Sequence, residues 1–186
     1  MQWSELEDQA CSLARTVSVI GDRWTLLILR DCFLKVRRFD DFQSRLRIGR
    51  PILADRLNKL VEAFVLTKVA YQTNPIRYEY RLTAKGLDLY PVVMSIVHWG
   101  DIHMAGKKGR PLLHHHLTCD HKFDPVMVCS ECQEALEARQ VRAEIGPGAC
   151  QPEHLPMDLA MEARRRPAKA KAKSRAKSKP PEAADA

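Results

Sequence analysis

The chain has 186 residues, 45% of them hydrophobic, which is enough to bury one core of ordinary size with some chain left over. Its first residues are acidic and lack a signal-like apolar stretch, and its apolar runs are too short to cross a bilayer. Together with a formal net charge of +7, this predicts a compact cytoplasmic domain with appendages and argues against a secreted or membrane protein.

The positive charge is unevenly distributed along the chain. Residues 163–186 hold nine Lys or Arg and two Asp or Glu, so residues 1–162 sum to zero. Within that neutral part, residues 35–85 hold twelve basic and five acidic residues, a local net charge of +7. A basic patch on a neutral body is the electrostatic footprint of a protein that binds a phosphate backbone.

Two helices are predicted at the N-terminal end. Apolar residues recur on one helical face between Cys11 and Ile20, and Gly21 is expected to end that helix as a C′ residue. Asp22 is well placed to cap the next helix, residues 23–34. Because this second helix is apolar almost all round its middle, it is predicted to form the centre of the core.

Residues 39–46 and 53–60 each carry apolar side chains at helical spacing, which predicts two short amphipathic helices. Gly49 supplies the tight link between them, and Pro51 fits the first turn of the second, where its missing N–H costs nothing. The pair is predicted to form a helix-turn-helix, with the second helix as the recognition helix.

Residues 67–72 and 77–82 alternate between apolar and polar side chains, which predicts two strands. The turn residues 73–75 between them favour a hairpin, or wing. The predicted fold class is therefore mainly α with a small β-hairpin (α+β), a winged helix-turn-helix.

Beyond the hairpin, Thr83 is expected to cap a short helix that breaks before Pro91, followed by a second helix reaching about His103. The apolar face of this last helix is wider than a small core can cover. Together with the first helix, it is predicted to form the interface of a homodimer.

The predicted organisation has four parts. Residues 1–105 form the winged helix-turn-helix for DNA binding and dimerisation, and residues 106–111 form a linker. Residues 112–150 form a small Cys-rich unit. Residues 151–186 are a Lys/Ala/Pro-rich tail with too few apolar side chains for a core, which predicts disorder and a salt-sensitive, sequence-independent affinity for DNA.

The Cys-rich unit offers four metal donors in two close pairs: Cys119, His121, Cys129 and Cys132. A Cys-x2-Cys pair is typical of half a tetrahedral zinc site, and four protein donors would make the zinc structural. Residues 123–128 between the pairs are expected to form a strand. Two interpretations remain open, a zinc-ribbon-like unit and a hairpin with free thiols. The run 114–116 of three histidines could contribute a ligand, but a solvated run is the favoured interpretation.

In combination, these segments resemble the HxlR-type winged helix-turn-helix transcriptional regulators over roughly residues 10–105. The matching segments are Cys11, 20–30, 38–42, 53–57, 78–86 and Trp99-Gly100. The resemblance implies a homodimer on operator DNA, with each wing along the backbone or in the minor groove. The chain departs from the family at Phe64, where a glycine usually ends the recognition helix, and at Arg50-Pro51, which opens that helix.

Five basic side chains are predicted to contact DNA. Arg50 is expected to approach a base edge, because the N-terminal turn of a recognition helix enters the major groove first. Arg56 and Lys59 are assigned to phosphates, and so is Arg38 at the start of the preceding helix. Arg77, near the tip of the wing, is assigned to the minor groove or its phosphates.

Cys11 lies at the start of the first helix, where the helix dipole and free N–H groups favour a thiolate. The family resemblance implies that such a cysteine senses oxidants or electrophiles. A second interpretation is a small residue buried at the dimer interface.

The predicted function is a sequence-specific regulator, most readily a repressor, that binds an operator in double-stranded DNA as a homodimer. We expect it in the cytoplasm with the nucleoid, responding to a thiol oxidant or another small effector. The sequence shows no phosphate-cradling Gly-rich loop and no paired catalytic carboxylates, so no enzyme is predicted. The alternative is a zinc-dependent protein-interaction adaptor whose winged helix only dimerises.

Overall fold

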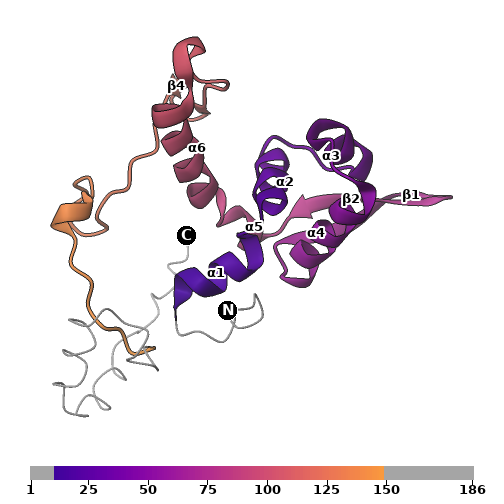
Figure 1. Cartoon of the computed structure of the whole chain (residues 1–186), viewed down its shortest axis with the longest axis horizontal. Coiled ribbons are helices and arrows are strands. Elements are labelled where there is room, and N and C mark those ends of the chain that lie inside the picture. Colours follow the sequence, from indigo (N-terminus) through magenta and orange to yellow (C-terminus); the bar gives the residue numbers. More distant parts are fainter. Residues whose placement is uncertain (1–10, 149–186) are drawn as a thin grey trace, which may run out of the picture. The chain divides into compact units, whose positions relative to one another are not determined.

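A computed structural model of the chain describes residues 11–148 (Figure 1). The chain divides into two compact units, residues 1–141 and 142–186, and the elements below belong to the first. The predicted tail, residues 151–186, lies outside the described residues. No described helix combines the length and apolar character needed to cross a membrane.

The first two helices are α1 (Ser12–Ile20) and α2 (Arg23–Phe33). Helix α1 ends before Gly21 as predicted, and Gly21 has a φ of −74°. Glycine is needed there because an added Cβ would lie 2.5 Å from the carbonyl oxygen of Val17. The predicted cap is confirmed, because the Asp22 carboxylate accepts the N–H groups of Trp24 and Thr25 at 2.9 and 3.3 Å.

The helix-turn-helix consists of α3 (Phe39–Leu46) and α4 (Arg50–Glu62), with Pro51 in the first turn of α4 as predicted. Both helices pack against α2, which lies beside them (Figure 1). The central side chains of this core are fully buried: Ile28, Leu29, Phe42, Leu53, Leu57 and Leu60.

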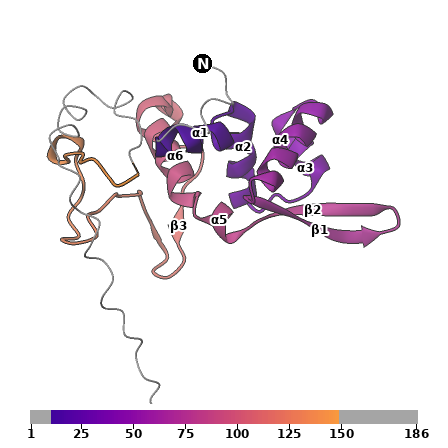
Figure 2. The same ribbon diagram turned by 90° about the horizontal axis from the view of Figure 1, so that it is seen from below.

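The wing is an antiparallel hairpin of β1 (Leu66–Thr73) and β2 (Ile76–Leu82), with Leu66 opposite Leu82 and a bulge at Ala70–Gln72. Its strands run out past α3 and α4 (Figure 2). The α2–α3 link joins the root of this sheet, where the N–H of Tyr80 donates to the carbonyl of Arg37 at 2.8 Å. The wing is therefore tied to the helical body at both ends of the helix-turn-helix.

Phe64, at the exit of α4, keeps the backbone conformation that glycine adopts most readily. Its φ is +57°, and its side chain is 75% exposed. The next N–H, that of Val65, donates to the carbonyl of Leu60 at 2.9 Å, which closes the end of the helix. A left-handed residue with a Cβ carries steric strain, and here burial of the ring does little to offset it.

The predicted break near Pro91 is confirmed. Thr83 caps α5 (Ala84–Leu87), and α6 (Tyr90–Met104) begins anew with Pro91 in its first turn. Helix α6 buries only Val93 and Met94 in the core. Its large exposed apolar side chains include Ile96 at 50%, Trp99 at 59%, Ile102 at 56% and Met104 at 74%.

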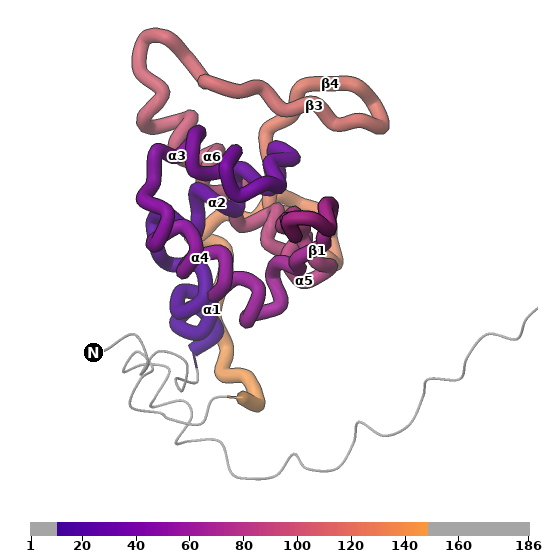
Figure 3. Tube along the Cα trace, turned by 90° about the vertical axis from the view of Figure 1, so that its right-hand side faces the viewer, coloured from indigo at the N-terminus to yellow at the C-terminus, as the bar shows by residue number. Residues whose placement is uncertain are grey.

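The Cys-rich segment forms a short hairpin of β3 (His115–His116) and β4 (His121–Lys122), seen as a narrow loop in Figure 3. The strand expected over residues 123–128 is wrong, because only Val128 forms a bridge, to Ala135. No residue between 112 and 148 is buried. The segment is held to α6 by Asp124, which pairs with Arg110 and lies 3.7 Å from the His98 imidazole.

Candidate nucleic-acid interface

Helix α4 turns its leucines inward and leaves a mixed polar face outside. The exposed residues are Arg50, Pro51, Ile52, Asp55, Asn58, Lys59 and Glu62. Because this face carries both signs of charge, the positive excess of the motif resides mainly in the flanking segments and the wing. The recognition helix itself therefore offers hydrogen-bonding groups rather than a uniformly basic surface.

Arg50 stands at the first position of α4, as expected, and is held there from α3. Its guanidinium donates to the Gln43 side-chain oxygen at 2.9 Å and to Asp40 at 3.3 Å. It also lies over the ring of Phe39, with 4.9 Å between the guanidinium carbon and the ring centroid. Its side chain is still 64% exposed, so donors remain accessible at the end of the helix.

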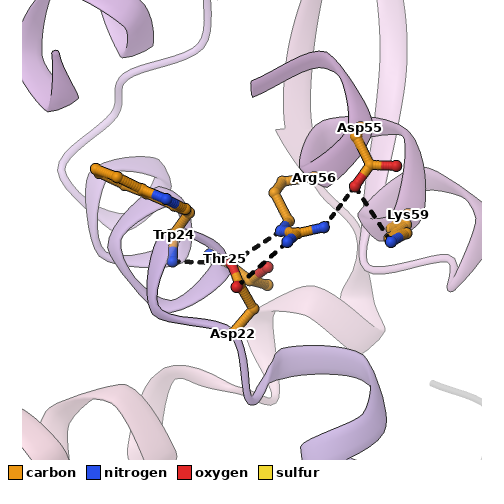
Figure 4. Close-up of polar contacts among 6 residues, drawn as sticks. All are labelled: Asp22, Trp24, Thr25, Asp55, Arg56 and Lys59. Atoms are coloured by element: carbon orange, nitrogen blue, oxygen red, sulfur yellow. Dashed lines mark hydrogen bonds and ion pairs between the residues drawn. The ribbon is translucent and has the colours of Figure 1, made fainter. Parts of the chain in front are cut away.

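Arg56 does not face outward, and the structure does not support its assignment to phosphate. Its Nε and Nη2 donate to the two carboxylate oxygens of Asp22, at 2.9 and 3.3 Å (Figure 4). Its third nitrogen pairs with Asp55, and the side chain is only 24% exposed. Arg56 therefore braces the recognition helix against the start of α2.

Asp22 has two structural tasks at once, because it caps α2 and receives Arg56. Burial alone would raise the pKa of the Asp22 carboxyl. The hydrogen bonds from Arg56 and from the N–H groups of Thr25 and Trp24 outweigh burial and leave this pKa below its ordinary value of 3.8. The same partnership raises the pKa of the Arg56 guanidinium, chiefly through its hydrogen bond with Asp22.

Lys59 and Asn58 lie on the accessible face. Lys59 pairs with Asp55 at 3.2 Å one turn earlier, and its side chain is 60% exposed, which leaves it available to a phosphate. Asn58 was missed by the sequence predictions: its side-chain oxygen accepts from Lys68 Nζ of β1 at 2.9 Å. An exposed asparagine on a recognition helix is a recognised adenine reader, which is the signal that could have identified it.

The two remaining predicted residues, Arg38 and Arg77, lie at different places along the wing. Arg38 lies at the root, over the ring of Tyr71 at 4.6 Å and 3.7 Å from Glu79. The pKa of the Glu79 carboxyl is lowered, first by its hydrogen bond with Arg81. Arg77 lies next to the turn, exposed, and makes no ion pair with any residue from 11 to 148. It is thus the freer cation of the two.

The cysteines occupy different environments. Cys11 is exposed at the N-cap position of α1, with its side chain making no cap hydrogen bond. Cys32 is buried in α2, and burial raises the pKa of its thiol to about 12, so this sulfur stays protonated.

The four predicted metal donors are not brought together. Cys119 lies beside His116, with 3.4 Å between Sγ and Nδ1, rather than beside His121, and Cys129 adjoins Cys132. Across residues 11–148, no three His, Cys, Asp or Glu side chains are positioned to hold a metal ion.

Comparison with known proteins gives consistent matches. The family model described as HxlR-like helix-turn-helix matches residues 19–108. Two helix-turn-helix transcriptional regulators of uncharacterised function, Mb3122 of Mycobacterium bovis and Rv3095 of Mycobacterium tuberculosis, are 42% identical to the chain over 137 residues, 74% of this chain and 87% of each relative. A match covering that much of the chain extends into the Cys-rich segment.

Two solved structures of candidate transcription factors share the fold. PA1607 is 30% identical with a TM-score of 0.68, and the match covers 75% of this chain and 98% of that one. PA1374 from Pseudomonas aeruginosa is 32% identical with a TM-score of 0.54, and the match covers 82% of this chain and 99% of that one. With its winged helix-turn-helix and these relatives, the chain belongs to the HxlR-like helix-turn-helix family of DNA-binding transcriptional regulators.

Proposed function

We propose that this regulator is a homodimeric repressor that acts in the cytoplasm by occupying a near-palindromic operator. The observation that carries the proposal is the joint placement of an accessible α4 and a wing whose exposed Arg77 pairs with no acidic residue between 11 and 148, on an otherwise neutral body. Occupancy of the operator would exclude the transcription machinery sterically.

Recognition is assigned to the N-terminal and central parts of α4. Arg50 can donate two hydrogen bonds to a guanine edge, and Asn58 can pair with an adenine, once each releases its intramolecular partner. Lys59 and Arg77 are assigned to phosphates, which fix the register without reading sequence. Arg38 supports this surface from the root of the wing.

Dimerisation is assigned to the exposed apolar side chains of α6, with Leu13 of α1, itself 71% exposed, as a further contact. A contiguous apolar face of this kind on a helix that contributes little to its own core is suited to an isologous contact. Two copies related by a two-fold axis would present their α4 helices to half-sites about 10 base pairs apart, or a multiple of that spacing.

The effector response is assigned to Cys11. A peroxide would oxidise its exposed sulfur to a sulfenic acid and would itself be reduced to water. Helix α1 ends at Ile20, and only Gly21 separates it from Asp22, whose carboxylate holds Arg56. A displacement of α1 would therefore reach the orientation of α4 through this ion pair.

The DNA proposal is tested with duplexes selected from a random pool by the full chain, followed by fluorescence anisotropy at several salt concentrations. Arg77→Glu should weaken binding to all DNA sequences by a similar factor. It should also reduce the slope of log affinity against log salt concentration by about one per lost phosphate contact. Arg50→Ala should reduce the discrimination between bases at one operator position by about 1–3 kcal/mol. Arg139→Glu, an exposed charge reversal in the C-terminal segment, is the matched control and should bind normally.

Unchanged affinity and specificity in both Arg77→Glu and Arg50→Ala would contradict this interface and favour the adaptor alternative. For the effector, mild peroxide should release the wild-type protein from its operator but not a Cys11→Ser variant. Release that persists in Cys11→Ser would remove Cys11 from the mechanism.

A further inference from the structure

The Cys-rich segment contains two hairpins whose ladders follow one pattern thirteen residues apart. In the first, residues 114–123, His115 lies opposite Lys122. In the second, residues 127–136, Val128 lies opposite Ala135. The flanking hydrogen bonds repeat as well, from Phe123 N–H to the His114 carbonyl at 3.1 Å and from Leu136 N–H to the Met127 carbonyl at 2.8 Å.

The turns at the tips of the two hairpins also correspond, again with an offset of thirteen residues. At the first tip, the N–H of Asp120 donates to the carbonyl of His116 at 2.7 Å, and Asp120 has a φ of +54°. At the second, the N–H of Gln133 donates to the carbonyl of Cys129 at 2.9 Å, and Gln133 has a φ of +62°. The same turn, ended by a left-handed residue, is therefore built twice from unlike sequences.

This register aligns the metal donors in pairs, His116 with Cys129 and Cys119 with Cys132. In the first pair, Nδ1 of His116 lies 3.4 Å from Sγ of Cys119. One tetrahedral zinc ion with bonds of about 2.0 Å to nitrogen and 2.3 Å to sulfur would separate these two atoms by about 3.5 Å. The first tip already holds the spacing of a shared metal ion.

The second tip holds its two sulfurs at the corresponding positions. Cys129 and Cys132 take the places of His116 and Cys119 in the repeated register, and the two cysteines lie close enough to interact. His121, in contrast, occupies the place of Glu134 on the returning strand, so the repeat gives it no donor role.

The described part of the segment has no hydrophobic core of its own. Residues 112–148 contain no buried side chain, and Leu117 and Met127 are 93% and 70% exposed. Two isolated hairpins with such short ladders are at best marginal in water. A bound metal ion is a common substitute for a core in units of this size.

We propose that His116, Cys119, Cys129 and Cys132 bind one structural zinc ion that joins the two hairpins. Each pair is preformed, although the described residues do not bring three donors together. The three residues 124–126 connect the hairpins, and a connection of this length keeps their adjoining ends within roughly 14 Å. Rotation within this connector lets the tips close on the ion, and a closed Cys3His set is structural rather than catalytic.

The test uses the full chain, purified under reducing conditions with zinc present, and measures zinc per chain by mass spectrometry. One zinc ion per chain is expected. Cys119→Ser, Cys132→Ser and His116→Ala should each weaken zinc affinity at least about tenfold, since even indirect partners of a metal contribute that much. His121→Ala is the matched control and should keep the ion. A stoichiometric fraction well below one in the wild type would overturn the site.

Cobalt substitution separates the ligand assignment from general misfolding. The Co²⁺ form should show thiolate-to-metal charge transfer and the intense visible bands of a tetrahedral site. His116→Cys should retain the metal and shift these visible bands to longer wavelength, as expected when sulfur replaces nitrogen. Loss of metal in His121→Ala with retention in His116→Ala would overturn the assignment of His116.

Discussion

Arg56 of the recognition helix and Asp22 at the start of α2, thirty-four residues apart, share two hydrogen bonds, at 2.9 and 3.3 Å. The pair connects the proposed recognition helix to the N-terminal cap of the central core helix. The Asp22 carboxylate accepts hydrogen bonds both from the first turn of α2 and from the Arg56 guanidinium. A displacement of the N-terminal end of α2 therefore alters a contact that α4 makes directly.

The first prediction concerns the coupling between these two residues. Arg56→Gln and Asp22→Asn should each destabilise the fold, and their double-mutant cycle in urea should give a coupling of about 1 kcal/mol, since both side chains are partly exposed. If Arg56 instead serves DNA directly, Arg56→Gln would weaken operator binding while Asp22→Asn would not. If Arg56 instead holds α4 against α2 through Asp22, the two single variants should lose similar operator affinity. These losses should not add in the double variant.

The second prediction concerns pH. The pKa of the Asp22 carboxyl is lowered in the folded state, so its stabilisation is present above the ordinary value of 3.8 and is lost as pH falls through the folded value. Asparagine retains the cap but not the charge. The stability difference between wild type and Asp22→Asn, from urea unfolding, should therefore be constant above about pH 5 and shrink below about pH 4. A difference independent of pH would contradict the role of the charge.

The third prediction concerns the strained residue Phe64, with its φ of +57° and its exposed ring. Phe64→Gly should raise the free energy of unfolding by about 1 kcal/mol, because it removes left-handed strain and sacrifices little burial. Phe64→Ala is the control, since it removes the ring but keeps the strain, and it should remain close to wild type. An equal shift in both variants would assign the effect to the ring.

The fourth prediction concerns the close approach of Gly86 to the backbone. An added Cβ would lie 2.2 Å from the carbonyl oxygen of Val65, so Gly86→Ala should destabilise by about 2 kcal/mol or more. Gly100→Ala is the contrast, because nothing lies within 4 Å of its added Cβ, and alanine favours a helix interior by about 0.5–1 kcal/mol. Thermal unfolding of both variants gives the comparison, and a stable Gly86→Ala would refute the contact.

The fifth prediction concerns the dimer. Ile96→Glu places a charge in the proposed α6 interface and should raise the dimer dissociation constant at least about a hundredfold, measured by analytical ultracentrifugation. Leu87→Glu, at an apolar position 55% exposed on α5, is the control and should leave the dimer intact. An Ile96→Glu protein that dimerises normally would place the interface elsewhere.

Much of the fold could be predicted because the relevant signals are local. The Asp22 cap, Pro51 in the first turn of α4 and the break at Pro91 follow from hydrogen bonds and steric limits within a few residues. The end of α1 at Gly21 was predicted as well, but the close approach to Val17 that requires a glycine there is seen only in the folded backbone.

The sequence by itself determined the order of elements, the inward leucines and the location of the basic excess, because periodicity and charge are properties of neighbouring residues. The tertiary structure decided what individual side chains do. The Arg56 side chain does not face outward, because folding brings the Asp22 carboxylate, which is distant in the sequence, within hydrogen-bonding distance. His116, rather than His121, joins Cys119 because hairpin register, which spacing alone does not specify, decides which donors share a turn.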